Sequence, residues 1–181
     1  AFWPGPLTLV IPIVEENIPT LVRAGLSTAA FRVPMHPVTR QLLEITGPLV
    51  MPSANLSGRP SATSAEHVEV DFGKDFPVLN GGPCEKGVES TILIFQEASW
   101  KLGRLGAIAA EDFFAVLGYV PLEAKKGKAP LCPGQRYRHY APRGQLYFGP
   151  MEKVGTVLGY SDRAYANDLH VIVLGAAKDP Q

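Results

Sequence analysis

Short hydroxyl and amide side chains are concentrated in one stretch of the chain, residues 47–67, which reads GPLVMPSANLSGRPSATSAEH. An apolar segment, predicted as a short strand, ends at Pro52, and Ser53 and Asn55 follow directly. Hydroxyls and free backbone N–H groups at the carboxyl end of a buried strand, with a helix start beyond them, are typical of anion-binding sites. The same composition is equally typical of a surface turn, so this stretch leaves both interpretations open.

The helix start is predicted from residues 63–66, Thr-Ser-Ala-Glu. This pattern fits a capping box, in which Thr63 is the N-cap residue and Glu66 bonds back to the Thr63 amide. We therefore expect a helix from here, and a loop over residues 53–61 that is held at both ends.

Two arginines are predicted near strand ends. Arg32 lies inside the apolar segment 28–33, where a guanidinium needs a carboxylate, either from the protein or from a bound ligand. We favour the ligand, since Pro34 ends the strand nearby, and Thr28 is the weaker polar residue of the same strand. Arg104 lies between two glycines ahead of a predicted helix, where it either reaches a phosphate or is a plain surface arginine.

Ser90 opens a β-branched strand after a glycine turn, in the segment GVESTILIF. Its hydroxyl either donates to a carboxylate or phosphate of a ligand or bonds to its own backbone. A further segment, residues 136–140 (RYRHY), combines arginines, a histidine and aromatic rings. Such residues stack on bases and neutralise phosphates, so the segment is a nucleic-acid contact, a linker on the protein's own surface, or a flap over a ligand.

Composition limits the function classes. The chain has 181 residues, 46% of them apolar, with 17 basic and 17 acidic residues and no net charge. No overall field attracts nucleic acid or a membrane surface, so an anion site has to be local. The spacing of Cys84 and Cys132 does not fit a metal site, and both thiols are expected to be free. Without a membrane-spanning run or a signal sequence, we expect a soluble, cytoplasmic protein with no membrane partner.

The order of predicted elements indicates an α/β fold with a twisted, mostly mixed sheet and flanking helices. The expected strands are residues 7–13, 28–33, 78–79, 91–95, 100–105, 146–148 and 170–174, and the expected helices are residues 17–25, 37–46 and 107–117. We expect a first domain over residues 1–120, a linker over 121–143 and the start of a second, smaller domain over 144–181. Both ends of the chain are expected to be cuts through something larger.

Six segments, in this order, resemble the threonylcarbamoyl-AMP synthase family: FWPGPLTLV, FRVPMHP, PLVMPSANLSGRPSATSAEH, GVESTIL, LGRLGAI and PGQRYRHYAP. The resemblance is to the longer form, in which a YrdC-type domain is joined by a linker to a smaller Rossmann-like domain. It covers roughly residues 1–143. No standard nucleotide-binding motif is present, so phosphate binding would come from this scattered set.

This resemblance implies that L-threonine, bicarbonate and ATP form threonylcarbamoyl-AMP and pyrophosphate, a nucleotidyl transfer that supplies N6-threonylcarbamoyladenosine to tRNA. It implies tRNA and tRNA-modifying proteins as indirect partners, and Mg²⁺ with ATP by analogy. No residue is expected to act as a nucleophile or to bind a metal, since the reaction needs positioning and charge stabilisation. The implied L-threonine-binding residues are Arg32, Ser53 and Ser90; the implied ATP-binding residues are Thr28, Asn55, Thr63, Arg104 and Tyr137; Arg138 and His139 belong to the linker motif.

Two other functions stay open from the sequence. An RNA-binding module of YrdC type would use the arginine and tyrosine stretch, and a carbamoyl-transfer maturation domain would share the fold. The family's basic N-terminal portion, which precedes FWPGPLT, is missing from the sequence, so we expect weak or no synthase activity from these residues alone.

Overall fold

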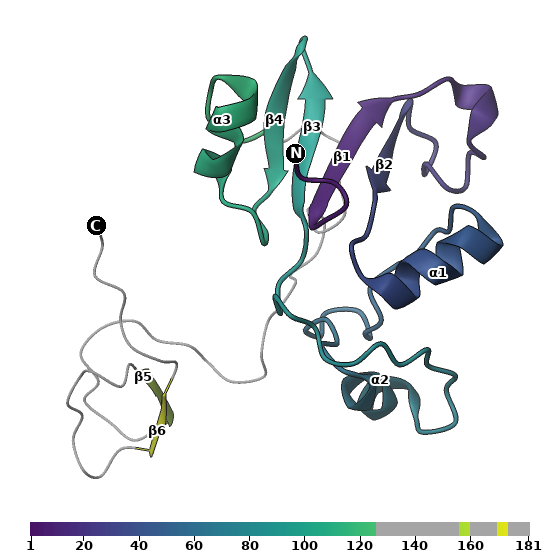
Figure 1. Cartoon of the computed structure of the whole chain (residues 1–181), viewed down its shortest axis with the longest axis vertical. Helices are drawn as coiled ribbons and strands as arrows, with labels where there is room; N and C mark the ends of the chain where they lie inside the picture. Colours follow the sequence, from purple (N-terminus) through teal and green to yellow (C-terminus); the bar gives the residue numbers. More distant parts are fainter. Residues whose placement is uncertain (126–155, 160–169, 174–181) are drawn as a thin grey trace. The chain divides into compact units, whose positions relative to one another are not determined.

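A computed structural model describes residues 1–125, 156–159 and 170–173 of the chain (Figure 1). The chain divides into two compact units, Ala1–Pro142 and Arg143–Gln181. In the first unit a four-stranded sheet has the order β2-β1-β3-β4. Its strands are β1 (Leu7–Pro12), β2 (Thr28–Arg32), β3 (Thr91–Gln96) and β4 (Ser99–Arg104).

The sheet is mixed, as predicted. β1 and β3 pair in parallel at its centre, and β2 and β4 add antiparallel strands on the outside. Strands β3 and β4 form the predicted hairpin, in which Glu97 and Ala98 at the turn have positive φ. The sequence therefore predicted all four strands of this sheet, and the mixed sheet with flanking helices is confirmed.

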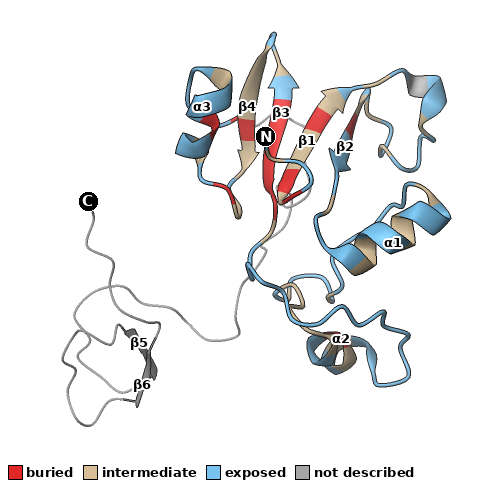
Figure 2. Cartoon of the chain, in the orientation of Figure 1, coloured by how far each residue is buried: buried red, intermediate tan, exposed pale blue. Residues whose placement is uncertain are grey.

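Alternate residues of the central strands build two separate apolar layers, and Figure 2 shows that the buried residues gather on these strands. Leu7 and Leu93 face one side, where they pack with Phe113 of the following helical segment. Val10 and Ile94 belong to the other cluster, together with Ile92 and Ala124. The second face carries the polar groups described below, since a strand directs successive side chains to opposite faces.

The last helical segment of the first unit begins later than predicted, next to two hydrogen bonds between Thr91 and Ile108. We predicted a helix over 107–117, but the structure has a 3-10 turn, η2 (Ala110–Phe113), and a short helix, α3 (Phe114–Leu117). The hydroxyl of Thr91, which has no exposed surface, donates to Ile108 O (2.7 Å) and accepts from Ile108 N (3.0 Å). These two bonds fix the backbone at Ile108, where the chain bends, and helical structure begins only at Ala110.

Helix α1 (Pro37–Thr46) has the bounds that the sequence predicts, with Pro37 at its start and Gly47 after its end. The prediction of a helix over residues 17–25 is wrong. That segment has a 3-10 turn, η1 (Glu15–Asn17), followed by irregular turns, and Ala24 and Gly25 adopt positive φ. Positive φ at two successive residues is incompatible with a right-handed helix, so the chain turns back toward β2 instead.

The short strands expected before Pro52 and at residues 78–79 are also absent from the described part of the chain. A strand needs a neighbour to accept and donate its backbone hydrogen bonds, and residues 48–52 pair with no described strand. Val50 and Met51 are correspondingly exposed, at 69% and 64%. Helix α2 (Ala65–Phe72) follows the loop as predicted.

In the second unit, β5 (Thr156–Gly159) and β6 (His170–Val173) pair in parallel. The strand expected over 170–174 is confirmed, whereas 156–159 was not predicted. The strand expected over 146–148 lies outside the described residues. The division into a domain, a linker and a second domain stays a prediction.

Candidate functional site

Four polar side chains gather on the second face of the sheet, and we call them the polar cluster: Thr8, Arg32, Ser90 and Arg104. The strand register brings them together, since Thr8 of β1 is the partner of Arg32 in β2 and of Ile92 in β3, and Ile92 is the partner of Arg104 in β4. Directly opposite residues of paired strands share a face. Three of these four residues were predicted as site residues from segments far apart in the sequence.

Ser90 is the centre of the polar cluster and is buried, with 7% of its surface exposed. Its hydroxyl lies 2.7 Å from the Thr8 hydroxyl. One terminal nitrogen of Arg104 donates to Ser90 O (2.9 Å) and approaches Ser90 Oγ at 3.3 Å, and Arg104 Nε donates to the same carbonyl. The backbone and side chain of Ser90 thereby fix the guanidinium of Arg104 at the entrance to β3.

Gly106 allows this entrance to form. A Cβ atom at residue 106 would lie 2.4 Å from Glu89 O and 2.5 Å from backbone atoms of Ser90 and Thr91. The backbone after β4 is therefore packed directly against the backbone that carries Ser90, and Ala107 N donates to Glu89 O (2.8 Å). Only glycine fits this close approach without movement of the strand entrance.

Arg32 is the last residue of β2, and its Nε donates to Gly5 O (3.1 Å). The residue is exposed. Partial burial, and then the positive charge of Arg104, lower the pKa of Arg32 below its ordinary value. Among the described residues no carboxylate forms an ion pair with either arginine. Two guanidinium groups within electrostatic reach of each other, with no carboxylate paired to them in residues 1–125, favour an anion from outside.

Thr28 does not join the polar cluster. It begins β2 opposite Pro12, whereas Arg32 ends the strand opposite Thr8. Four residues of strand separate the two by roughly 13 Å. Both side chains still belong to the same face of the strand, because they are an even number of residues apart.

The Ser/Asn loop is held by α2 instead of by the sheet. Asp71 of α2 accepts from Leu56 N (2.9 Å) and forms an ion pair with Arg59, and both hydrogen bonds lower the pKa of Asp71. Asn55 Nδ2 donates to Leu56 O and Arg59 O, both at 3.0 Å. The other end of that amide, Asn55 Oδ1, is buried and has no hydrogen-bond partner among the described residues, so its acceptor capacity is unused there.

Ser53 lies exposed at the start of this loop. No hydrogen bond or ion pair between described residues joins the loop to the polar cluster. The structure therefore places Arg32, Ser90 and Arg104 together on the sheet, Thr28 at the other end of β2, and Ser53, Asn55 and Thr63 in the segment between α1 and α2. Tyr137, Arg138 and His139 lie outside the described residues. Whether these residues bind the ligands named above stays a prediction.

The capping box predicted at Thr63 is wrong. The N-cap residue of α2 is Ser64, one residue later, and a hydrogen bond from the Ser64 side chain lowers the pKa of Glu66. The hydroxyl of Thr63 lies 3.1 Å from His67 Nδ1, and Thr63 N donates to the same nitrogen at 3.3 Å. The Thr63 hydroxyl is therefore paired with the His67 imidazole and does not cap the helix, whose first residue is Ala65.

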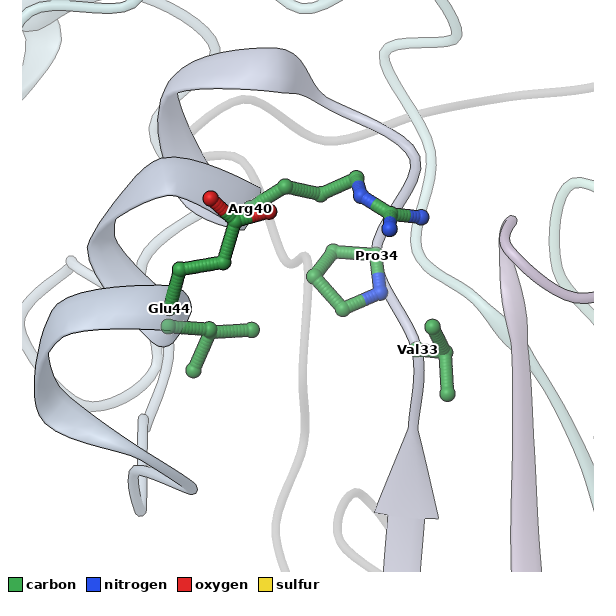
Figure 3. Close-up of a pocket in the computed structure, with 5 residues that line it drawn as sticks. Val33, Pro34, Arg40 and Glu44 are labelled. Atoms are coloured by element: carbon green, nitrogen blue, oxygen red, sulfur yellow. The ribbon is translucent and has the colours of Figure 1, made fainter.

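A shallow pocket of about 200 Å³ lies where β2 leads into α1, immediately after Arg32 (Figure 3). Val33, Pro34 and Leu43 form its apolar wall, and Arg40 and Glu44 of α1 supply its charges. Figure 3 shows the guanidinium of Arg40 extending past the Pro34 ring. His36 precedes α1, and its Nε2 lies at hydrogen-bond distance, 3.1 Å, from Gly81 O.

The sequence reasoning missed Thr8. Its signal was a hydroxyl within the apolar strand 7–13, the same kind of signal that pointed to Arg32. Of the two cysteines, Cys84 is a free, exposed thiol and Cys132 lies outside the described residues. None of the helices in the described ranges has the length and apolar character needed to cross a bilayer.

Comparison with known proteins assigns both parts of the chain. The Sua5/YciO/YrdC family model, described as "Telomere recombination", matches residues 1–106, and the model described as "Threonylcarbamoyl-AMP synthase, C-terminal domain" matches residues 108–180. The threonylcarbamoyl-AMP synthase of Pyrococcus abyssi is 42% identical over 161 residues, which are 84% of this chain and 47% of that protein. That of Bacillus subtilis is 43% identical over 152 residues, 80% of this chain and 43% of the relative.

A solved structure agrees with these relatives. The chain is similar to the crystal structure of P. abyssi Sua5 complexed with L-threonine, with a TM-score of 0.80 and 35% identity, over 97% of this chain and 58% of that one. The chain thus spans about half the length of the curated relatives that it matches.

Proposed function

This chain belongs to the Sua5/YciO/YrdC family of threonylcarbamoyl-AMP synthases, and on this premise we propose that it forms L-threonylcarbamoyladenylate and pyrophosphate from L-threonine, bicarbonate and ATP. In this proposal the protein is a nucleotidyltransferase. Its product serves N6-threonylcarbamoyladenosine formation in tRNA, with tRNA and tRNA-modifying proteins as indirect partners in the cytoplasm.

The observation that carries the proposal is the polar cluster. Two guanidinium groups lie on the sheet face that carries the buried hydroxyl of Ser90, without a carboxylate partner among the described residues, and that of Arg104 contacts this hydroxyl. An amino-acid carboxylate suits Arg32 and Ser90, because a guanidinium and a hydroxyl both donate to it. Arg104 lies beside them and suits a phosphate oxygen.

The loop supplies the second half of the proposed site. Ser53 contributes a donor between the two ligands, and the unpartnered Oδ1 of Asn55 accepts from a donor of the nucleotide. Thr28 and Thr63 are proposed as further ATP contacts. ATP would contact Thr63 through its backbone, or His67 would have to move, because the His67 imidazole already lies 3.1 Å from the Thr63 hydroxyl. Tyr137, Arg138 and His139 are proposed to complete the site as the linker motif.

Charge determines what these residues do in the reaction. The neutral threonine amine attacks bicarbonate with loss of water, or CO2 with loss of one proton, to give a carbamate. A carbamate oxygen then attacks the α-phosphorus of ATP, and the bond to the β-phosphate breaks to release pyrophosphate. The threonine carboxylate, the carbamate and the triphosphate are all anionic. The chain's contribution is therefore to bind the anions, align them and offset their repulsion, with no covalent protein intermediate.

Mg²⁺ is proposed as part of the substrate, MgATP. The described residues contain no group of three or more His, Cys, Asp or Glu side chains that could hold a metal ion. Magnesium commonly binds through substrate phosphates and water with few protein ligands, which fits a site built from arginines, hydroxyls and amides.

The test combines binding and turnover on the 181-residue chain. Isothermal titration with L-threonine, with ATP and with both measures the two sites, and pyrophosphate release with bicarbonate and MgATP measures the reaction. We expect L-threonine binding that ATP strengthens, with weak or no turnover. Binding of single-stranded RNA that falls steeply with salt and needs no threonine would favour the RNA-binding alternative. Binding of neither L-threonine nor ATP would contradict the proposal.

A further inference from the structure

Thr8 contributes a hydroxyl to the polar cluster, yet it belongs to neither the threonine nor the ATP residues proposed above. It lies 2.7 Å from Ser90 Oγ and directly opposite Arg32 across the β1–β2 pairing. Its backbone is paired on both sides, with β2 and with β3. A β-branched side chain on a central strand has little rotational freedom, so this hydroxyl is held in place.

The contact with Thr8 limits which further hydrogen bonds the Ser90 hydroxyl can make. A serine hydroxyl has one proton and two lone pairs. Arg104 can only donate, so its contact with Ser90 Oγ at 3.3 Å uses one lone pair. If Thr8 also donates, both lone pairs are used and the Ser90 proton is left for a ligand. If Ser90 donates to Thr8 instead, Ser90 has no proton to offer.

We propose that Thr8 is a positioning residue for L-threonine: it donates to Ser90 Oγ and thereby directs the Ser90 proton toward the ligand carboxylate. The inference rests on the proposed function. An anion beside Arg32 and Arg104 selects this arrangement over the reverse one, because a proton directed at a carboxylate is stabilised and a lone pair is repelled. Thr8 therefore acts through Ser90, without contacting the ligand itself.

The test is a set of variants titrated with L-threonine: Thr8→Val, Thr8→Ser, Ser90→Ala and the double variant Thr8→Val/Ser90→Ala. Valine keeps the shape of threonine and removes the hydroxyl. We expect Thr8→Val to raise the Kd for L-threonine about fivefold to tenfold, as the loss of one hydrogen bond does. Thr8→Ser should restore the Kd to within about twofold of the unmodified chain, since the donor returns. In the Ser90→Ala background, Thr8→Val should change nothing further.

Titration with a second ligand distinguishes a loss of Ser90 orientation in Thr8→Val from a general distortion of the sheet. L-Threoninamide has a neutral carboxamide in place of the carboxylate, so it gains less from the directed Ser90 proton. Thr8→Val should therefore weaken L-threonine more than L-threoninamide, whereas a distorted sheet would weaken both equally. Thr46→Val is the matched control, since that hydroxyl donates to Leu42 O within α1, and it should leave both affinities unchanged.

Failure of this inference can be distinguished from failure of the proposed function. Equal L-threonine affinity in the unmodified chain and in Thr8→Val overturns the inference, as does a Thr8→Val loss that persists in the Ser90→Ala background. If the unmodified chain binds no L-threonine, the proposed function fails instead. The Thr8–Ser90 bond is then tested without ligand by melting temperatures: shifts for the two single variants that do not add in the double variant support the bond, and additive shifts overturn it.

Discussion

At the residue scale, the arginines of the polar cluster are distinguished by what surrounds them. Arg104 is hydrogen-bonded to the backbone and hydroxyl of Ser90. Arg32 is an exposed residue whose side chain has one hydrogen bond to the described part of the chain, from its Nε to Gly5 O. Burial and the charge of Arg104 lower the pKa of Arg32, yet a guanidinium remains protonated across the physiological range. Arg32 is therefore a charged group with spare donors, and it should contribute more to ligand binding than to folding.

Substitution of Arg32 tests this directly. Arg32→Ala should weaken L-threonine binding about tenfold to 100-fold, as expected for the loss of charge-assisted hydrogen bonds to a carboxylate. Arg32→Lys should recover only part of the affinity, because an ammonium lacks the paired donors of the guanidinium. Isothermal titration measures the affinities, and urea denaturation should show nearly unchanged folding stability.

Arg40→Ala is the matched control for the loss of one positive charge, since Arg40 is exposed on α1 and lies outside the polar cluster. It should reduce L-threonine affinity by less than about twofold. Similar losses for both variants would show that net charge, and not the position of Arg32, governs binding.

At the element scale, two local attachments place the candidate site. The first joins the Ser/Asn loop to α2 through Asp71, which bonds to Leu56 N and pairs with Arg59. The second joins residues 106–108 to the entrance of β3 through the close approach at Gly106 and the two bonds of Thr91. Each attachment can be broken by one substitution.

The loop attachment should depend on pH. The Leu56 N–H and then Arg59 lower the pKa of Asp71, so the ionised carboxylate favours the attached loop. The attachment should be complete above the ordinary aspartate pKa of about 3.9 and be lost as the pH falls through the lowered value. Hydrogen exchange of the Leu56 amide, corrected for its intrinsic rate, measures this as a loss of protection at acidic pH.

Substitutions at Asp71 give the control for that profile. Asp71→Ala should remove the protection of the Leu56 amide at pH 7, since the acceptor is gone. Asp71→Asn keeps an acceptor oxygen but has no titrating group, so its remaining protection should no longer change with pH. Unchanged protection in Asp71→Ala would contradict the role of this contact.

Gly106→Ala should destabilise the sheet. The added Cβ would meet backbone atoms of Glu89, Ser90 and Thr91 at 2.4–2.5 Å, so the strand entrance has to move, at a cost of about 1–3 kcal/mol. Urea denaturation measures this loss. L-threonine affinity should fall as well, because the displaced segment carries Ser90.

Gly118→Ala is the comparison for Gly106→Ala, since nothing lies within 4 Å of a Cβ there and Gly118 has the left-handed helical conformation, with φ 76° and ψ 3°. Its cost should be about 1 kcal/mol, without effect on L-threonine affinity. A larger loss at residue 118 than at residue 106 would argue against the close approach.

At the scale of the whole molecule, the charges balance, with 17 basic and 17 acidic residues. The positive charge of the candidate site is local and depends on the sheet register that brings Arg32 and Arg104 to one face. Such a site attracts a small anion at short range, and it offers few contacts to a long polyanion.

This predicts a shallow salt dependence for any RNA binding. Two arginines that contact phosphates give a slope of log K against log salt of roughly −1.4, at about −0.7 for each single-strand contact. Filter binding of a single-stranded oligonucleotide between low and physiological salt measures the slope. A slope steeper than about −4 would require several more phosphate contacts and would favour the RNA-binding alternative.

The sequence by itself determined the elements whose signals are local. Branched apolar runs predicted the four strands of the sheet, and Pro37 with Gly47 predicted the bounds of α1. It also predicted Arg32, Ser90 and Arg104 as site residues, since each is a polar residue within or beside an apolar run and the motifs around them resemble one family. Local pattern failed where a specific side-chain contact competes with it. One such contact joins Thr63 to His67, four residues later, and another joins Thr91 to the backbone of Ile108, 17 residues later.

Only the tertiary structure decided which polar residues share a site. The register of β1, β2, β3 and β4 places Thr8, Arg32, Ser90 and Arg104 on one face, and it leaves Thr28 at the other end of its strand. A one-residue slip of any pairing would turn one of these side chains to the opposite face, because successive residues of a strand alternate. Pairing between strands is a contact between distant segments, and the order of residues within each strand does not specify it.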